Sequence, residues 1–84
     1  MREVRLNKQA EKYYLAQDSI ARKRIKTALV GLGEIPPKGD VIPVQGIPDT
    51  FRLRLGGYRL LFSIDDRVVI VTKIQPRGQV YKKL

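Results

Sequence analysis

The sequence predicts an α+β domain in which a helical hairpin packs on one face of a small, mainly antiparallel sheet. Three observations lead to this prediction. Residues 1–6 alternate as a short strand does, residues 8–32 repeat apolar side chains at helical spacing, and residues 51–74 hold three apolar runs separated by turn residues. The expected order is β-α-α-β-β-β, and a chain of 84 residues is expected to form a single domain, residues 1–84.

The first strand and the two helices have recognisable ends. In the opening six residues Val4 and Leu6 fall on one side, with charged residues around them. Asn7 then suits the N-cap of a first helix. Asp18 or Ser19 begins a second helix, and Gly31 and Gly33 supply its stop. The two helices are therefore expected to form an antiparallel hairpin joined by a very short turn.

A proline-rich stretch separates the helices from the remaining strands. Residues 34–50 carry four of the five prolines, which predicts an ordered loop. Isolated apolar residues such as Val41 and Ile47 indicate that this loop packs on the domain. The three apolar runs that follow are separated by Gly56-Gly57 and by residues 65–67, a pattern typical of a β-meander.

The first hairpin of the meander gathers arginines on one face. A two-residue turn at Gly56-Gly57 places Arg54 opposite Arg59, and alternation sends Arg52, Arg54 and Arg59 to the face opposite the apolar one. Like charges about 6 Å apart repel by roughly 0.7 kcal/mol at the dielectric of water and roughly 3 kcal/mol at an effective value of 20. A local rule broken on an exposed sheet face points to anion binding, and arginine suits planar, bidentate contact with phosphate.

The last strand extends this face in one of two ways. A three-residue loop at 65–67 continues the row Arg54, Arg59, Lys73 across three strands. A two-residue loop shifts the strand by one position and places Thr72 there instead.

The C-terminal tail adds two candidates to the same face. Arg77 and Tyr81 follow the third meander strand closely enough to reach its edge, and a tyrosine ring stacks well on a base of single-stranded RNA. Burial of Tyr81 against the core is the alternative. For the face as a whole, the alternative is a solvated surface on which the arginines cover apolar neighbours, namely Leu61, Val69 and Val71.

Composition narrows the class of partner. Seventeen Lys and Arg against eight Asp and Glu give a net charge of +9, which favours an anionic partner, nucleic acid first, over mere solubility. The absence of cysteine and histidine excludes a disulfide and a Cys-based zinc site and removes the commonest metal ligand and general base. No metal or cofactor is expected. No apolar run approaches the roughly 18 to 20 residues of a membrane span, so a cytoplasmic protein without membrane contact is expected.

Three stretches in order, "GIPDTFRLRLGGYRLLFSIDD", "RVVIVTKI" and "PRGQVY", resemble the RelE-type toxins of the RelE/ParE superfamily, which are ribosome-dependent mRNA interferases of toxin-antitoxin modules. The expected element order and the Pro/Gly-rich loop also fit, so the resemblance covers essentially the whole chain. It implies a metal-independent endoribonuclease that cuts mRNA in the ribosomal A site and so inhibits translation. The 2′-OH of the RNA attacks the adjacent phosphate in this reaction.

The resemblance also assigns roles to residues. Arg52 and Arg54 fall where these toxins have basic residues that activate the 2′-OH and hold the phosphate. Arg59 matches the arginine that stabilises the transition state. Arg77 matches the group that assists the leaving oxygen, and Tyr81 matches the tyrosine that stacks on the mRNA. Some relatives have lysine at positions 52 and 54, and many have histidine where Pro76 stands. Because arginine has a pKa above 12, it is a poor general base, and the acceptor of the 2′-OH proton is unassigned.

Partners and rival functions follow from the same resemblance. It implies a cognate acidic antitoxin, with operator DNA met only through that antitoxin, as well as the ribosome and mRNA. The second helix carries a basic face that contacts ribosomal RNA or is simply solvated; it consists of Arg22, Lys23, Arg24 and Lys26. One rival function is ParE-like inhibition of DNA gyrase by the same fold. Another is a non-catalytic RNA-binding relative.

Overall fold

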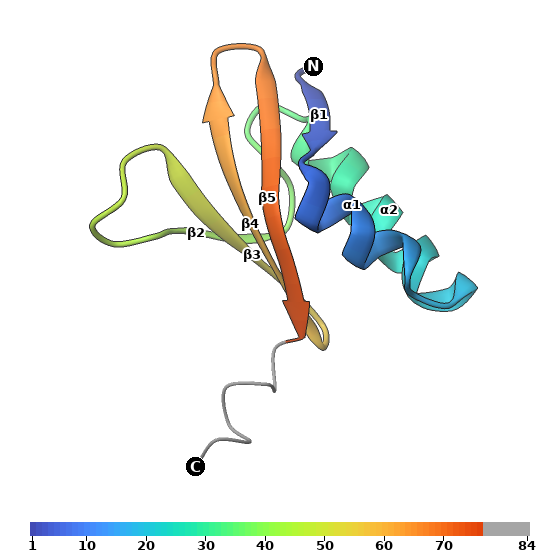
Figure 1. The fold of residues 1–84 in the computed structure, drawn as a ribbon. Helices are drawn as coiled ribbons and strands as arrows, with labels where there is room; N and C mark the ends of the chain where they lie inside the picture. The colour runs from blue at the N-terminus through green and yellow to red at the C-terminus, as the bar shows by residue number, and fades with distance from the viewer. Residues whose placement is uncertain (77–84) are drawn as a thin grey trace.

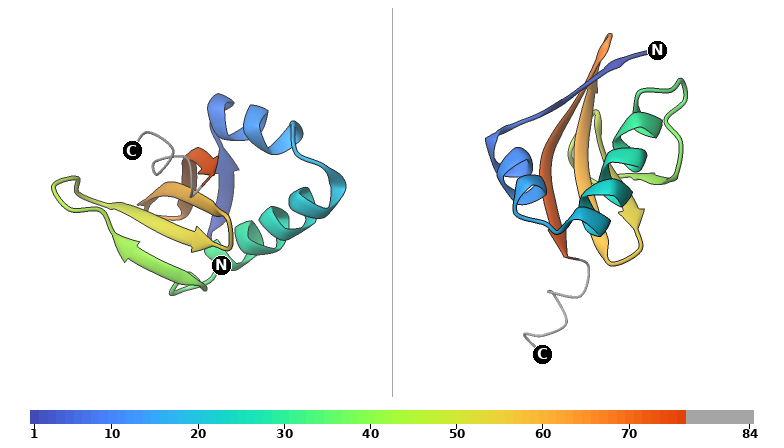
Figure 2. Two further views of the ribbon diagram at one scale, coloured as in Figure 1. Left: turned by 90° about the horizontal axis from the view of Figure 1, so that it is seen from below. Right: turned by 90° about the vertical axis from the view of Figure 1, so that its right-hand side faces the viewer.

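A computed structural model describes residues 1–76 of the chain. The elements are β1 (Glu3–Leu6), α1 (Lys8–Leu15), α2 (Ser19–Leu32), β2 (Asp40–Pro43), β3 (Thr50–Leu55), β4 (Tyr58–Asp65) and β5 (Val68–Pro76). The strands form one sheet in the order β1-β5-β4-β3-β2, in which only the β1–β5 pair is parallel among the described residues. Both helices lie on one face of this sheet (Figures 1 and 2), which confirms the predicted α+β fold.

Each helix begins at the cap that the sequence predicts. The side chains of Asn7 and Asp18 accept hydrogen bonds from the backbone N–H three residues later, at 3.0 and 2.8 Å. The second helix ends at Gly33, whose carbonyl accepts a hydrogen bond from the Arg2 N–H at 2.7 Å. A Cβ on Gly33 would lie 2.7 Å from the Arg2 carbonyl oxygen, so glycine allows β1 to pass this close to the helix end. None of the helices in residues 1–76 is long and apolar enough to cross a membrane.

The core lies between the helices and the sheet. Phe62, Leu60 and Ile74 supply it from the central strands, and Ile25 and Leu32 supply it from α2, all at 0% exposure. These residues stand at the alternating or helical positions that the sequence predicts for a core face. Neither of the helices in residues 1–76 lies on the opposite face of the sheet (Figure 1), which we call the open face.

The structure corrects the prediction for residues 34–50, which contain a strand as well as loop. In β2, Asp40 pairs with Arg54 and Pro43 with Phe51, so the sheet gains a fifth strand at its edge. Prolines around this segment predict a loop, but an edge strand tolerates proline because one side of it needs no ladder hydrogen bonds.

The last turn has two residues, as one of the two alternatives expected, but neither alternative places the right residue opposite Arg59. Asp65 pairs with Val68, so the turn has two residues, and Asp66 adopts a left-handed φ of 47°, which aspartate tolerates better than most residues. A register shift then makes Thr72 an extra residue on β5, because the neighbours Leu61 and Phe62 pair with Lys73 and Val71.

These two irregularities change which residues share a face. The residue opposite Arg59 is Gln75, whereas the sequence predicted Lys73 or Thr72. Val69 and Val71 are fully buried on the core face, so the arginines do not cover them as the solvated-surface alternative requires. The turn is one residue shorter than the three-residue loop, which moves β5 by one position. The bulge moves the rest of the strand back, so Ile74 still lies in the core.

A glutamine on α1 holds the bulged strand, which leads to a first prediction. The Gln9 Oε1 accepts a hydrogen bond from the Ile74 N–H at 3.3 Å. We expect Gln9→Ala to lower the free energy of unfolding by about 1 kcal/mol and to speed amide exchange at Ile74, measured by chemical denaturation and NMR. Gln17→Ala, which removes a bond to the carbonyl of Tyr13 within the same helical segment, is the control and leaves the Ile74 amide unchanged. An unchanged Ile74 amide in Gln9→Ala would contradict the assignment.

Candidate functional site

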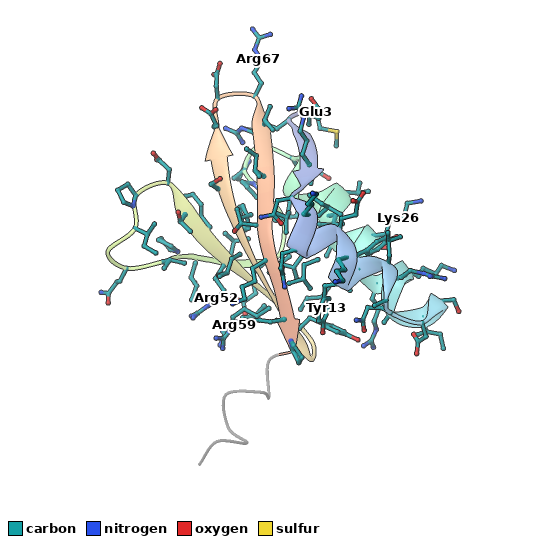
Figure 3. The ribbon with its side chains drawn as sticks, viewed as in Figure 1. Glu3, Tyr13, Lys26, Arg52, Arg59 and Arg67 are labelled. Carbon is teal, nitrogen blue, oxygen red and sulfur yellow. The ribbon has the colours of Figure 1, made fainter. Side chains whose placement is uncertain are left out.

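The open face of the sheet carries a group of cations that we call the arginine face, namely Arg52, Arg54, Arg59 and Lys73. Arg54 stands directly opposite Arg59, which confirms the register predicted from the Gly56-Gly57 turn. Figure 3 shows Arg52 and Arg59 projecting from the side of the sheet that is turned away from α1 and α2. The three hairpin arginines therefore share one surface, as predicted.

Two rows of cross-strand neighbours make up this surface. The first row is Asp40, Arg54, Arg59 and Gln75, and the second is Ile42, Arg52, Leu61 and Lys73. Lys73 therefore belongs to the face but shares a row with Arg52, and the predicted row through Arg59 is wrong. The apolar side chain of Leu61 lies between these two cations, half-buried.

Two of the arginines hold buried donors without acceptors. The Nε atoms of Arg52 and Arg59 are inaccessible to solvent and have no hydrogen-bond partner among the residues that the structure describes. A buried donor left unpaired costs about 1–3 kcal/mol. An oxyanion entering between these side chains would supply acceptors that residues 1–76 do not provide at these atoms.

The third arginine is paired with an acid that the sequence did not suggest. The Arg54 Nε donates to Asp40 Oδ2 at 2.9 Å, and the two side chains are 47% and 51% exposed. Asp40 was missed because it lies in the segment predicted as a loop, where no register could be assigned. An exposed pair of this kind contributes at most about 1 kcal/mol to stability, so the pair is of interest for its position.

The basic residues of α2 belong to the helical layer on the other side of the sheet, but two of them share a cleft with Arg54. Lys26 lies on the helical side of the molecule, away from Arg52 and Arg59 (Figure 3). Lys23 and Arg24 line this cleft of about 740 Å³ between α2 and β3, and its lining also includes Arg54 of the arginine face. Its apolar lining includes Ala28, Leu53 and Leu55, and Arg22 lies half-buried on the same helix.

Two predicted site residues, Arg77 and Tyr81, fall outside the described residues, so their positions stay predictions. The described part of β5 ends at Pro76, which pairs with Tyr58 beside the hairpin turn. The end of the strand therefore lies next to the row that contains Arg59.

Shifted pKa values are found at Tyr13 and at the Glu3–Arg5 pair. Burial raises the pKa of Tyr13, and the neighbouring Tyr58 adds to the effect, their rings meeting edge to face at 6.4 Å. A hydrogen bond from Arg5 lowers the pKa of Glu3, and the same bond raises the pKa of Arg5. Within residues 1–76 no three carboxylates gather as metal ligands. The chemistry of the arginine face therefore depends on its cations and on Asp40.

The fold of this chain is that of small toxins found in toxin-antitoxin modules, as comparison with known proteins shows. The chain belongs to the family described as the ParE toxin of the type II toxin-antitoxin system, parDE, whose model matches residues 4–81. No curated protein sequence matches it. Its structural relatives place it in the RelE/ParE superfamily.

Three solved structures are similar to this chain over most of its length. RelE in the archaeal RelE-RelB complex from Pyrococcus horikoshii OT3 is 30% identical, with a TM-score of 0.74 over 93% of this chain and 97% of that one. The isolated Escherichia coli RelE toxin is 28% identical, with a TM-score of 0.76 over 99% of this chain and 94% of that one. A chain of the intact E. coli RelBE toxin-antitoxin complex is 26% identical, with a TM-score of 0.71 over 90% of this chain and 96% of that one.

Proposed function

We propose that this toxin is an endoribonuclease that cleaves mRNA in the ribosomal A site without a metal and so inhibits translation. The observation that carries the proposal is the direct pairing of Arg54 with Arg59, beside Arg52 and Lys73, on the face of the sheet opposite α1 and α2. Packing of the core does not require four cations there, and their mutual repulsion opposes folding. Phosphate groups of RNA match them in charge and in bidentate geometry.

The proposed reaction uses the RNA as its own nucleophile. The 2′-OH attacks the adjacent phosphate, and the products are a cyclic phosphate and a free 5′-OH. Charge that develops on the phosphorane is stabilised by guanidinium groups placed before the reaction begins. Arg52 and Arg54 hold the phosphate and Arg59 stabilises the transition state; Arg77 and Tyr81 are proposed to assist the leaving oxygen and to stack on the mRNA. The ribosome would supply the in-line geometry.

An acidic antitoxin is the proposed partner. The relatives from P. horikoshii and E. coli are described as RelE-RelB and RelBE complexes. A net charge of +9 favours an acidic chain that covers the arginine face and blocks RNA. Operator DNA would then be contacted through the antitoxin. We propose that the basic residues of α2 contact ribosomal RNA and that the toxin acts in the cytoplasm.

The test is cleavage on programmed ribosomes. The purified protein is added to ribosomes holding a defined mRNA codon in an empty A site, and cuts are mapped by primer extension. We expect a cut within the A-site codon and slower cleavage of the same mRNA without ribosomes. Intact mRNA in both reactions would remove the enzymatic proposal.

Inhibition of DNA gyrase is the second candidate, because the matching family model is that of the ParE toxin. The two candidates differ in their targets, so a supercoiling assay with purified gyrase is run beside the cleavage assay. Inhibited supercoiling with intact mRNA would favour the ParE-like function. Cleaved mRNA with unaffected supercoiling favours the function proposed here.

The charge of the arginine face predicts a salt dependence for binding. If three or four phosphates of a single-stranded RNA are neutralised, the affinity falls with log salt at a slope of about −2 to −3, or roughly 20- to 50-fold between 50 and 200 mM. Fluorescence anisotropy with a labelled RNA measures this slope. Arg52→Gln is expected to reduce the slope by about 0.7. Arg67→Gln, at the distant β4–β5 turn (Figure 3), leaves it unchanged, and equal slopes in all three proteins would contradict the assignment.

A further inference from the structure

The proposed cleavage needs a group that accepts the 2′-OH proton. The chain has no histidine, and a guanidinium or ammonium group has no free lone pair for a proton. Among residues 1–76, Asp40 is the carboxylate that is bonded to an arginine of the arginine face. Glu3, by contrast, pairs with Arg5 on β1, the opposite edge strand of the sheet.

We propose that Asp40 is the general base of this reaction, an inference that rests on the proposed function. Asp40 opens β2 and stands opposite Arg54, which stands opposite Arg59, so the three side chains project from the same face of the sheet. Neighbouring strands lie about 4.8 Å apart, which separates the backbones of Asp40 and Arg59 by about 10 Å. That span accommodates a ribose beside the carboxylate and its phosphate beside the arginines.

The fold holds this carboxylate in place while leaving it accessible. The Asp40 Oδ2 accepts a hydrogen bond from the Arg54 Nε at 2.9 Å, so in this proposal the 2′-OH proton goes to the other oxygen, Oδ1. The Asp40 side chain is 51% exposed. The preceding Gly39 has a φ of 114°, and a Cβ there would lie 2.7 Å from the Leu53 side chain. The backbone leading into Asp40 is therefore pressed against β3 in a conformation that glycine provides.

The proposed step balances without a metal or cofactor. The 2′-O–H proton moves to the Asp40 carboxylate as the O2′–P bond forms. The P–O5′ bond then breaks, and the leaving 5′ oxygen takes a proton from solvent. Asp40 returns its proton to water, which restores the carboxylate. The arginines stabilise the negative charge on the phosphorane throughout.

The test compares Asp40→Asn with wild type in single-turnover cleavage on programmed ribosomes. An asparagine amide oxygen accepts the same bond from Arg54 but cannot take the proton, so we expect cleavage to fall about 100-fold or more. RNA affinity is expected to stay equal or to rise, because the face loses one negative charge. Asp40→Glu is expected to recover part of the rate. Glu3→Gln, which breaks another exposed ion pair on the sheet, is the matched control with unchanged cleavage.

Three outcomes would overturn the inference. Cleavage by Asp40→Asn within about threefold of wild type excludes Asp40 as the base while the proposed function stands, since general bases contribute roughly 100-fold or more. Equal losses of RNA affinity and of cleavage would assign Asp40 a structural role in the face. Absence of cleavage by the wild type would overturn the proposed function and this inference with it.

Discussion

Arg59→Ala is expected to lower the single-turnover rate of mRNA cleavage on programmed ribosomes by roughly 100- to 1,000-fold, the effect of removing one preorganised donor from a charged transition state. Arg59 lies between Arg54 and Gln75 in its row, and its Nε is buried without a hydrogen-bond partner in the part of the chain that the structure describes. Arg59 therefore lies at the centre of the arginine face, where it would contact a phosphorane bound there. The rate is measured with toxin in excess over ribosomes, which separates the chemical step from turnover.

The same substitution is expected to leave the protein at least as stable as the wild type. Removing Arg59 relieves its repulsion with Arg54 and removes an unpaired donor. A thermal unfolding midpoint that is unchanged or raised, together with lost cleavage, would show that stability is given up for function at this residue.

Two further variants separate charge from geometry at this position. Arg59→Lys keeps the charge but loses the planar, two-pronged donor, so an intermediate rate is expected. Arg67→Ala, at the far turn (Figure 3), is the control and cleaves as the wild type does. Arg59→Ala that cleaves at the wild-type rate would exclude Arg59 from the site.

The features that the sequence predicted correctly depend on local chemistry. Asn7 and Asp18 cap the helices because their side chains bond backbone groups three residues away. The Gly56-Gly57 turn set the register of β3 and β4 because a two-residue loop permits one pairing. The arginine pair at the centre of the candidate site followed from that register.

The features that the sequence missed depend on distant contacts. The extra residue at Thr72 lies beside a strand that Gln9 holds by a hydrogen bond across 65 positions of sequence. The strand β2 exists because β3 offers it an edge, and prolines on both sides of it predict a loop. Asp40 was missed for the same reason, because its bond to Arg54 appears only when β2 pairs with β3.

A second large effect is expected in the core, where Phe62→Ala is predicted to lower the free energy of unfolding by about 3–5 kcal/mol. Phe62 is fully buried and stacks on Phe51 with ring centroids 5.6 Å apart. Domains of this size have about 5–15 kcal/mol of stability in total, so the variant will be largely destabilised. Equilibrium denaturation by urea measures the change.

The controls for Phe62 test whether the core and the arginine face can be separated. Phe62 and Arg59 both lie on β4 but project from opposite faces, because the spacing between them is odd. Phe62→Leu is a smaller change in volume, so it is expected to lose less stability and to cleave mRNA at the wild-type rate while folded. Ile47→Ala, at an exposed site, should change stability by less than about 0.5 kcal/mol. Equal denaturation midpoints for Phe62→Ala and wild type would contradict the core described here.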